Sequence, residues 1–309
     1  MGGVTCNRGT RTNKRSQELH TVEYLPEGQT PRALLFFQHG YGEHIGRYRS
    51  VHTELASSGI AVFGMDAHGH GRSEPRDEDD RALVHAFSHL VEDYAEYAGE
   101  VRARFGGAAG PPAFAAGQSM GGLLATHLVL RDQTAWAGLI LCSAAIDIEW
   151  SLVTRIQAPI GNLLALLVPR WRIVPAVPLE YISNDPAVVA DFAADPLNFV
   201  GNVRAKTANE LLKGFREVQQ RQAELRVPLL ALHGTHDHIT SYPAVKRLLQ
   251  VSQSRDASLV EFPGAYHELF MGAERDASVR ALRDCTAASA QPRGWVLQHV
   301  HQAEDASKL

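Results

Sequence analysis

The stretch that decides the fold is residues 115–122, which read Ala115-Ala116-Gly117-Gln118-Ser119-Met120-Gly121-Gly122. The apolar run before Gly117 is typical of a short buried strand, and apolar residues at helical spacing after Gly122 indicate a helix. A serine between the two occupies a sharp strand-to-helix turn, which needs glycine on either side and exposes the hydroxyl. With 26 glycines in the chain, Gly-x-Ser-x-Gly can occur by chance, so the flanking strand and helix carry the prediction of a nucleophile at Ser119.

The rest of the chain alternates short apolar strands with amphipathic helices. Further strands are expected at 33–38, 60–65, 136–144, 227–232 and 257–262, after a first edge strand at 19–25. Helices are expected at 48–58, 80–105, 207–222, 275–285 and 294–302. This order predicts an α/β fold with a doubly wound, mostly parallel sheet, whose chemistry lies beyond the carboxyl ends of the strands.

The predicted organisation is one core interrupted by an inserted helical cap. Residues 1–16 are polar and basic and are expected to form a flexible arm, residues 17–145 and 223–303 the core, and residues 304–309 a tail. Residues 146–222 break the strand–helix alternation and are expected to form the cap, or lid. Within it, the apolar helix 159–168 is only ~15 Å long, too short to span a bilayer. We expect it to line an acyl pocket and to touch a membrane or lipid-droplet surface transiently; the alternative is that it packs in the core.

Composition narrows the class of protein. The chain has 309 residues, 45% of them hydrophobic, and a formal net charge of -4, which indicates a globular protein and argues against a nucleic-acid partner. Three cysteines make a disulfide framework improbable and fit a reducing compartment. No run reaches ~18 apolar residues, so no transmembrane helix is expected, and no secretory segment is expected at the N-terminus.

A serine hydroxyl needs a base and a group that orients the base. In this fold the order along the chain is nucleophile, acid, histidine, each on a loop after a strand. That order selects Asp237 after the strand 227–232 and His267 after the strand 257–262. The backbone N–H groups of Met120 and Tyr41 are the expected oxyanion donors.

Two histidine groups offer metal-binding alternatives. His68 and His70 have ligand-like spacing, although a structural turn is favoured. The cluster of His233, His236 and His238 could belong to a metallohydrolase, but that hypothesis leaves the serine turn unexplained. We therefore expect no metal and no cofactor.

Six motifs together resemble one family, the monoacylglycerol lipase-like serine hydrolases of the α/β-hydrolase fold. They are residues 39–48 (His39-Gly40-Tyr41-Gly42-Glu43-His44-Ile45-Gly46-Arg47-Tyr48), 66–73, 117–122, 183–186, 233–237 and 264–267. The resemblance implies a cofactor-free hydrolase of monoacylglycerols or related single-chain lipid esters, with a mobile hydrophobic cap. It also implies that Glu43 and Arg47 lie near the polar headgroup pocket, the alternative being a plain surface pair.

The chain departs from this family at two positions. Phe270 stands where the mammalian lipases have a histidine, three residues after the catalytic one, and Gln118 replaces a common histidine before the serine. Because Phe270 replaces the histidine of the headgroup pocket, lysophospholipids and other small esters are alternative substrates. A general carboxylesterase or an acyltransferase would use the same three residues, whereas a member that only binds a ligand typically lacks one of them.

The two ends of the sequence resemble two different targeting signals. Ser307-Lys308-Leu309 matches the tripeptide bound by the peroxisomal import receptor, and residues 1–6, ending in Cys6, approximate an acylation site. We expect a peroxisomal or glycosomal location; a cytoplasmic or acylated, membrane-associated protein is the alternative.

Deletion of Ser307–Leu309 from a protein tagged at its N-terminus should abolish the organellar location, because the receptor reads the free terminal tripeptide. Fluorescence microscopy measures the distribution, and an unchanged pattern would refute the expectation. Release from membranes by Gly2→Ala would favour acylation instead.

Overall fold

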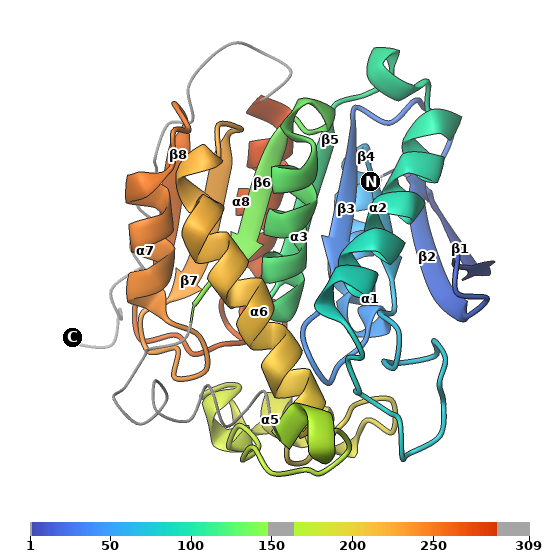
Figure 1. Cartoon of the computed structure of the whole chain (residues 1–309). Coiled ribbons are helices and arrows are strands. Elements are labelled where there is room, and N and C mark those ends of the chain that lie inside the picture. The colour runs from blue at the N-terminus through green and yellow to red at the C-terminus, as the bar shows by residue number, and fades with distance from the viewer. Residues whose placement is uncertain (1, 148–163, 289–309) are drawn as a thin grey trace.

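The structure, a computed structural model, describes residues 2–147 and 164–288 (Figure 1). The described residues form an eight-stranded sheet in the order β1-β2-β4-β3-β5-β6-β7-β8. The strands are β1 (Val4–Thr12), β2 (Glu18–Pro26), β3 (Ala33–Gln38), β4 (Ile60–Met65), β5 (Ala113–Gln118), β6 (Gly138–Cys142), β7 (Leu229–Gly234) and β8 (Ala257–Phe262). The helices are α1 (Arg49–Ser57), α2 (Phe87–Arg104), α3 (Met120–Arg131), α5 (Pro186–Ala194), α6 (Ala205–Arg221), α7 (Tyr242–Val251) and α8 (Arg275–Ala288).

Strands β3 to β8 are parallel and confirm the predicted α/β fold with a doubly wound, mostly parallel sheet. Every residue of β3, β4, β5, β6 and β7 is buried, because helices cover both faces of the sheet. Helices α2, α3, α6 and α7 pack on one face, and α1 and α8 pack on the other (Figure 1). Within the described ranges, no helix combines the length and the apolar character that crossing a membrane requires.

The predicted flexible arm is wrong: β1 pairs antiparallel with all of β2, so β2 is not the edge strand that the sequence suggested. Most of β1 is exposed, so hydrophobic burial does not hold it. The turn between β1 and β2 holds the strand in place instead. There the Asn13 side-chain oxygen accepts hydrogen bonds from the N–H groups of Arg15 (2.9 Å) and Gln17 (3.0 Å). An asparagine that bonds to the backbone ahead of it fixes a tight turn and hence the register of the hairpin.

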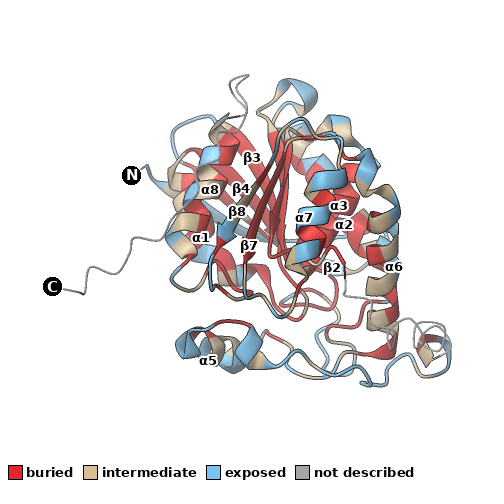
Figure 2. Cartoon of the chain, turned by 90° about the vertical axis from the view of Figure 1, so that its left-hand side faces the viewer, coloured by how far each residue is buried: buried red, intermediate tan, exposed pale blue. Residues whose placement is uncertain are grey.

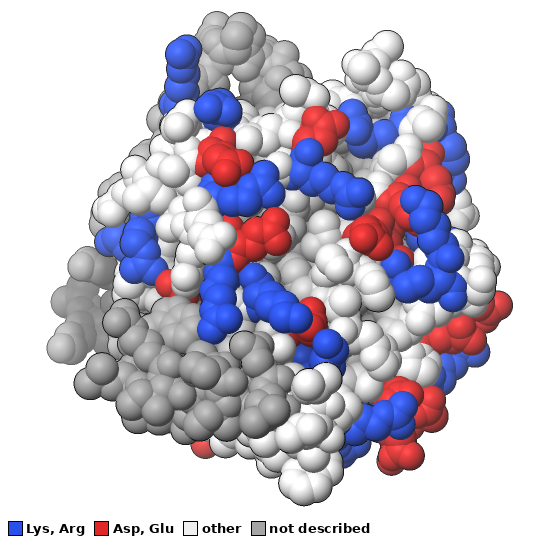
Figure 3. All heavy atoms as spheres, viewed as in Figure 1, with Lys and Arg blue, Asp and Glu red and all other residues white. Residues whose placement is uncertain are grey.

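Charges also fasten the hairpin to α2. Arg11 contacts Glu100 at 2.7 Å, Lys14 contacts Glu96 at 2.7 Å, and Arg15 bonds to the buried Asp93. Figure 3 shows acidic and basic side chains intermixed over this face of the molecule. Single exposed pairs contribute at most about 1 kcal/mol, so the set matters more than any member.

Within the predicted cap, residues 164–204 lie across the carboxyl ends of the strands (Figures 1 and 2). It is attached there by polar contacts: the Phe199 N–H donates to the Gly42 carbonyl oxygen at 2.7 Å, and His44 Nε2 lies 2.9 Å from Asp195 Oδ2. Helix α6, by contrast, buries Phe215 and Val218 in the core beside α3. The expected insertion, 146–222, therefore includes a helix that packs against α2 and α3 of the core.

Several expectations fall partly or wholly outside the described residues. Of the apolar helix 159–168, residues 164–168 are described; residues 164–167 are helical, with Ala165 buried and Leu166 and Leu167 exposed. The expected helix 294–302 and the tail with Ser307–Leu309 lie outside the described ranges.

Candidate active site

The turn between β5 and α3 presents Ser119. Its φ of 53° and ψ of −118° are values that side chains other than glycine rarely adopt, as expected for a nucleophile on a strand-to-helix turn. A Cβ on Gly117 would lie 2.1 Å from the carbonyl carbon of Gly121, and a Cβ on Gly121 would lie 2.1 Å from the Gln38 carbonyl oxygen. Both distances are far below van der Waals contact, so both positions require glycine.

Asp237 and His267, from the loops after β7 and β8, form a hydrogen-bonded pair. His267 Nδ1 lies 2.8 Å from Asp237 Oδ2. The other oxygen, Oδ1, accepts the N–H groups of Ile239 at 2.8 Å and Thr240 at 3.0 Å. Thr240 Oγ1 also donates to Oδ2 at 2.7 Å. Four donors thus fix the carboxylate, which in turn fixes the imidazole and leaves its Nε2 available for other chemistry.

The interaction between Asp237 and His267 shifts the pKa of each group in the direction that favours its charged form. Burial alone would raise the pKa of Asp237, but His267 and the hydrogen bonds hold that pKa below its ordinary value. Burial alone would lower the pKa of His267, but the Asp237 carboxylate raises that pKa above its ordinary value. The histidine is therefore a stronger base than a free imidazole.

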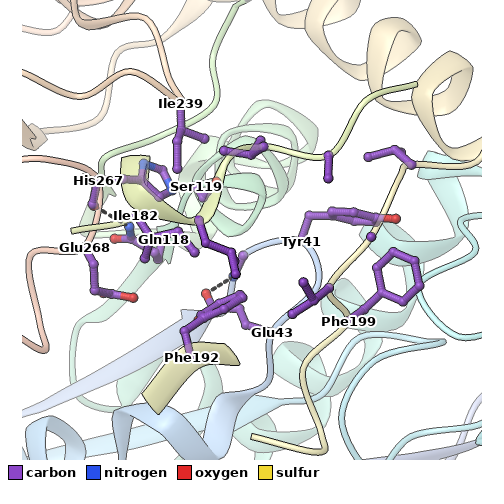
Figure 4. A pocket seen from close by; sticks show the side chains of 17 residues that line it. Tyr41, Glu43, Gln118, Ser119, Ile182, Phe192, Phe199, Ile239, His267 and Glu268 are labelled. Carbon is purple, nitrogen blue, oxygen red and sulfur yellow. Dashed lines mark hydrogen bonds between the residues drawn. The ribbon is translucent and has the colours of Figure 1, made fainter. Parts of the chain in front are cut away.

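Ser119, His267 and the loop from Gly40 to Glu43 line one pocket (Figure 4). The cap supplies most of its apolar wall. That wall consists of Ala176, Val177, Leu179, Ile182, Phe192, Phe199, Val200 and Val203, with Ile239 from the loop after β7. Polar groups from the sheet edge thus face an apolar surface from the cap, an arrangement suited to a ligand with one reactive polar end and an apolar remainder.

The two expected oxyanion donors belong to segments that adjoin Ser119. Met120 is the first residue of α3, where backbone N–H groups have no acceptor within the helix. Gly40 precedes Tyr41, and a Cβ on Gly40 would lie 3.1 Å from the Ser119 Cβ, so this loop passes directly beside the serine. The Tyr41 hydroxyl donates to the Ala82 carbonyl oxygen at 3.0 Å, which holds the ring away from the serine.

Glu43 and Arg47 are buried and paired, so a plain surface pair is excluded. Their side chains are only 5% and 7% exposed, and Arg47 Nε lies 3.0 Å from Glu43 Oε2. Glu43 Oε1 accepts the Gly40 N–H at 2.6 Å and the Tyr48 hydroxyl at 2.7 Å. Glu43 therefore fixes the Gly40–Tyr41 loop; a direct role in headgroup binding stays a prediction.

Sequence reasoning missed a contact made by Gln118. Its Nε2 donates to the His267 carbonyl oxygen at 3.0 Å and so ties the serine turn to the histidine loop. The sequence does not predict this bond, because no sequence motif indicates which distant residue the Gln118 side chain contacts. The sequence does mark the position, since Gln118 departs from the common histidine there.

The structure does not bring the alternative metal ligands together. His233 is buried beneath Asp237, with Nε2 3.4 Å from its Oδ2, whereas His236 and His238 are exposed. His70 Nδ1 bonds to the His68 carbonyl oxygen at 3.0 Å, as in a structural turn. Across residues 2–147 and 164–288, no histidine, cysteine or acidic side chains are grouped as metal ligands.

The raised pKa of His267 predicts the acid limb of the pH–rate profile. The neutral imidazole is the base, so activity should fall as the pH drops through the raised value, which lies above the ordinary 6.5. Measurement of kcat/KM between pH 5 and pH 9 would locate the limb. Asp237→Asn should shift the limb of the residual activity to lower pH, since it removes the charge that raises the pKa. A wild-type limb below 6.5 would contradict the assignment.

Comparison with known proteins agrees with this geometry. The profile of the family described as serine aminopeptidase, S33 (Hydrolase_4) matches residues 29–275. The monoacylglycerol lipase of Mycolicibacterium smegmatis is 29% identical over 279 residues, or 87% of this chain and 90% of that protein. The monoglyceride lipase of Homo sapiens is 29% identical over 257 residues, covering 83% and 82%.

Solved structures share the fold. A soluble variant of the monoglyceride lipase from Saccharomyces cerevisiae matches with a TM-score of 0.78 at 19% identity, over 91% of this chain and 94% of that chain. The monoacylglycerol lipase of Paleococcus ferrophilus matches with a TM-score of 0.74 at 23% identity, over 88% and 99%. The chain thus belongs to the Hydrolase_4 family and is a serine hydrolase of the α/β-hydrolase fold, similar to the monoacylglycerol lipases.

Proposed function

We propose that this chain hydrolyses monoacylglycerols, or closely related single-chain lipid esters, through an acyl-enzyme on Ser119. One observation carries the proposal: the strained serine and His267, which Asp237 orients, line a single pocket whose apolar wall comes mostly from the cap. The relatives named above, which are glyceride lipases, support the choice of ester.

The chemistry follows from the positions of the groups. His267 Nε2 accepts the Ser119 proton as Oγ attacks the ester carbonyl carbon, and the Met120 and Tyr41 N–H groups stabilise the resulting oxyanion. Collapse of this intermediate breaks the bond to the alcohol, which leaves with the proton from His267. Water then attacks the acyl-enzyme by the same route, releases the fatty acid and restores Ser119.

The pocket favours substrates with one acyl chain. Its apolar wall is formed by cap residues that lie over the serine, and a covered pocket of this kind has a place for one chain but none for the second and third chains of a triacylglycerol. The apolar wall also excludes water from the acyl group, which strengthens the oxyanion contacts.

Ser119→Ala should lower kcat for monooleoylglycerol by about 10⁶-fold, because it removes the nucleophile. Wild-type protein should react with a fluorophosphonate probe, keep its rate in EDTA and cleave monooleoylglycerol faster than emulsified trioleoylglycerol. Full activity of Ser119→Ala would refute the mechanism, and so would loss of wild-type activity in EDTA. Equal rates on the two glycerides would refute the substrate assignment.

We also propose that the cap contacts the lipid surface from which the substrate comes. Three apolar side chains near its start, Leu166, Leu167 and Trp171, are 77%, 67% and 63% exposed. Large apolar side chains exposed together mark an interaction surface. A lipid surface would bury these three side chains.

Replacement of Leu166, Leu167 and Trp171 by serine should weaken binding to phosphatidylcholine vesicles at least about tenfold, since each side chain contributes on the order of 1.5 kcal/mol or more when buried. Vesicle flotation measures the binding, and hydrolysis of a soluble short-chain ester should stay within about twofold. Val251→Ser, which removes an apolar side chain 41% exposed on α7, is the control. Unchanged flotation of the triple variant would refute the lipid contact.

A further inference from the structure

The residue after the candidate base, Glu268, lies in the pocket and is almost completely buried. It is 6% exposed and lines the same cavity as Ser119 and His267 (Figure 4). Its N–H donates to the Ile182 carbonyl oxygen at 2.8 Å, so its backbone is fixed against the cap. The proposed mechanism assigns no role to this carboxyl group.

Among the residues that the structure describes, one oxygen of Glu268 has no hydrogen-bond donor. Oε2 accepts a hydrogen bond from Arg47 Nη2 at 3.3 Å, whereas Oε1 is buried and has no hydrogen-bond donor among the described residues. Glu43 differs, because both of its oxygens have donors. A buried acceptor without a donor is costly, and a ligand that supplies the donor recovers that cost.

The surroundings indicate which kind of donor fits. Burial and the Glu43 carboxylate raise the pKa of Glu268, against the opposing effect of Arg47. A cationic group would bind only the ionised carboxylate. A hydroxyl group fits both states, since it donates to a carboxylate and accepts from a carboxylic acid. Ile182 and Phe192, which line the same pocket, are apolar and suit a neutral ligand better than a charged one.

The position of Glu268 indicates which part of the substrate it meets. His267 delivers its proton to the departing alcohol, and Glu268 lines the same pocket as His267 and Ser119. We propose that Glu268 Oε1 binds a free hydroxyl of the alcohol portion and thereby selects esters of polyols such as glycerol. This proposal rests on the proposed function and adds the residue that distinguishes one alcohol from another.

Three laurate esters that differ only in the alcohol test the proposal: 1-monolauroylglycerol, methyl laurate and lauroylcholine. Glu268→Met should lower kcat/KM for the glycerol ester about 10-fold to 100-fold, as expected for loss of a hydrogen bond to a buried carboxyl group. The rates on methyl laurate and lauroylcholine should change less than about threefold. Glu268→Gln, whose amide still bonds to a hydroxyl, should recover part of the loss on the glycerol ester.

Labelling of Ser119 by a fluorophosphonate shows whether each variant retains its site, and Glu261→Met, on the exposed part of β8, is the matched control. If Glu268→Met lowers all three rates equally while labelling persists, Glu268 only balances Arg47 and the proposal is wrong. A selective loss on lauroylcholine would instead assign a cationic alcohol and also overturn it. If Glu268→Met does not fold, Glu268→Gln decides, since a loss confined to the glycerol ester supports the proposal, and no change or an equal loss on all three esters refutes it. Hydrolysis of all three esters that persists in Ser119→Ala would refute the proposed function itself.

Discussion

The site depends on how closely three backbone segments approach at the start of α3. Gly121 packs directly on the carbonyl of Gln38, and Gly117 packs on Gly121. No side chain fits between them, so β3, β5 and α3 are held in one arrangement. That arrangement holds Ser119 in its strained conformation and brings the loop after β3 beside it. Folding energy from the sheet therefore maintains a geometry that the turn would not adopt alone.

Around this fixed point, the polar groups of the site hold one another in place. Backbone and hydroxyl donors surround Asp237, Asp237 orients His267, and Gln118 joins the His267 loop to the serine turn. Glu43 does the same for the loop that carries Tyr41. Each group that moves protons or charge is thus held by a neighbour before substrate arrives, which lowers the cost of reorganisation during the reaction.

The sequence predicts the parts of this molecule that depend on local pattern. Strands buried on both faces are apolar runs, and Ser119, Asp237 and His267 each follow one, so the sheet and the order of the site residues were accessible. Strand β1 was not, because its polar residues are ordered by the Asn13 turn and by pairing rather than by burial. The contacts of Gln118 and Glu268 were inaccessible for another reason: they join loops far apart in sequence, and only the fold decides which loops meet.

The bond from the Phe199 N–H to the Gly42 carbonyl oxygen has a mechanical consequence. Gly42 follows Tyr41, whose N–H is an expected oxyanion donor, while Phe199 forms part of the apolar wall. An acyl chain that pushes Phe199 outward must pull on this loop or break the bond. The wall that an acyl chain would contact and the loop that carries an expected oxyanion donor are therefore joined by one backbone hydrogen bond.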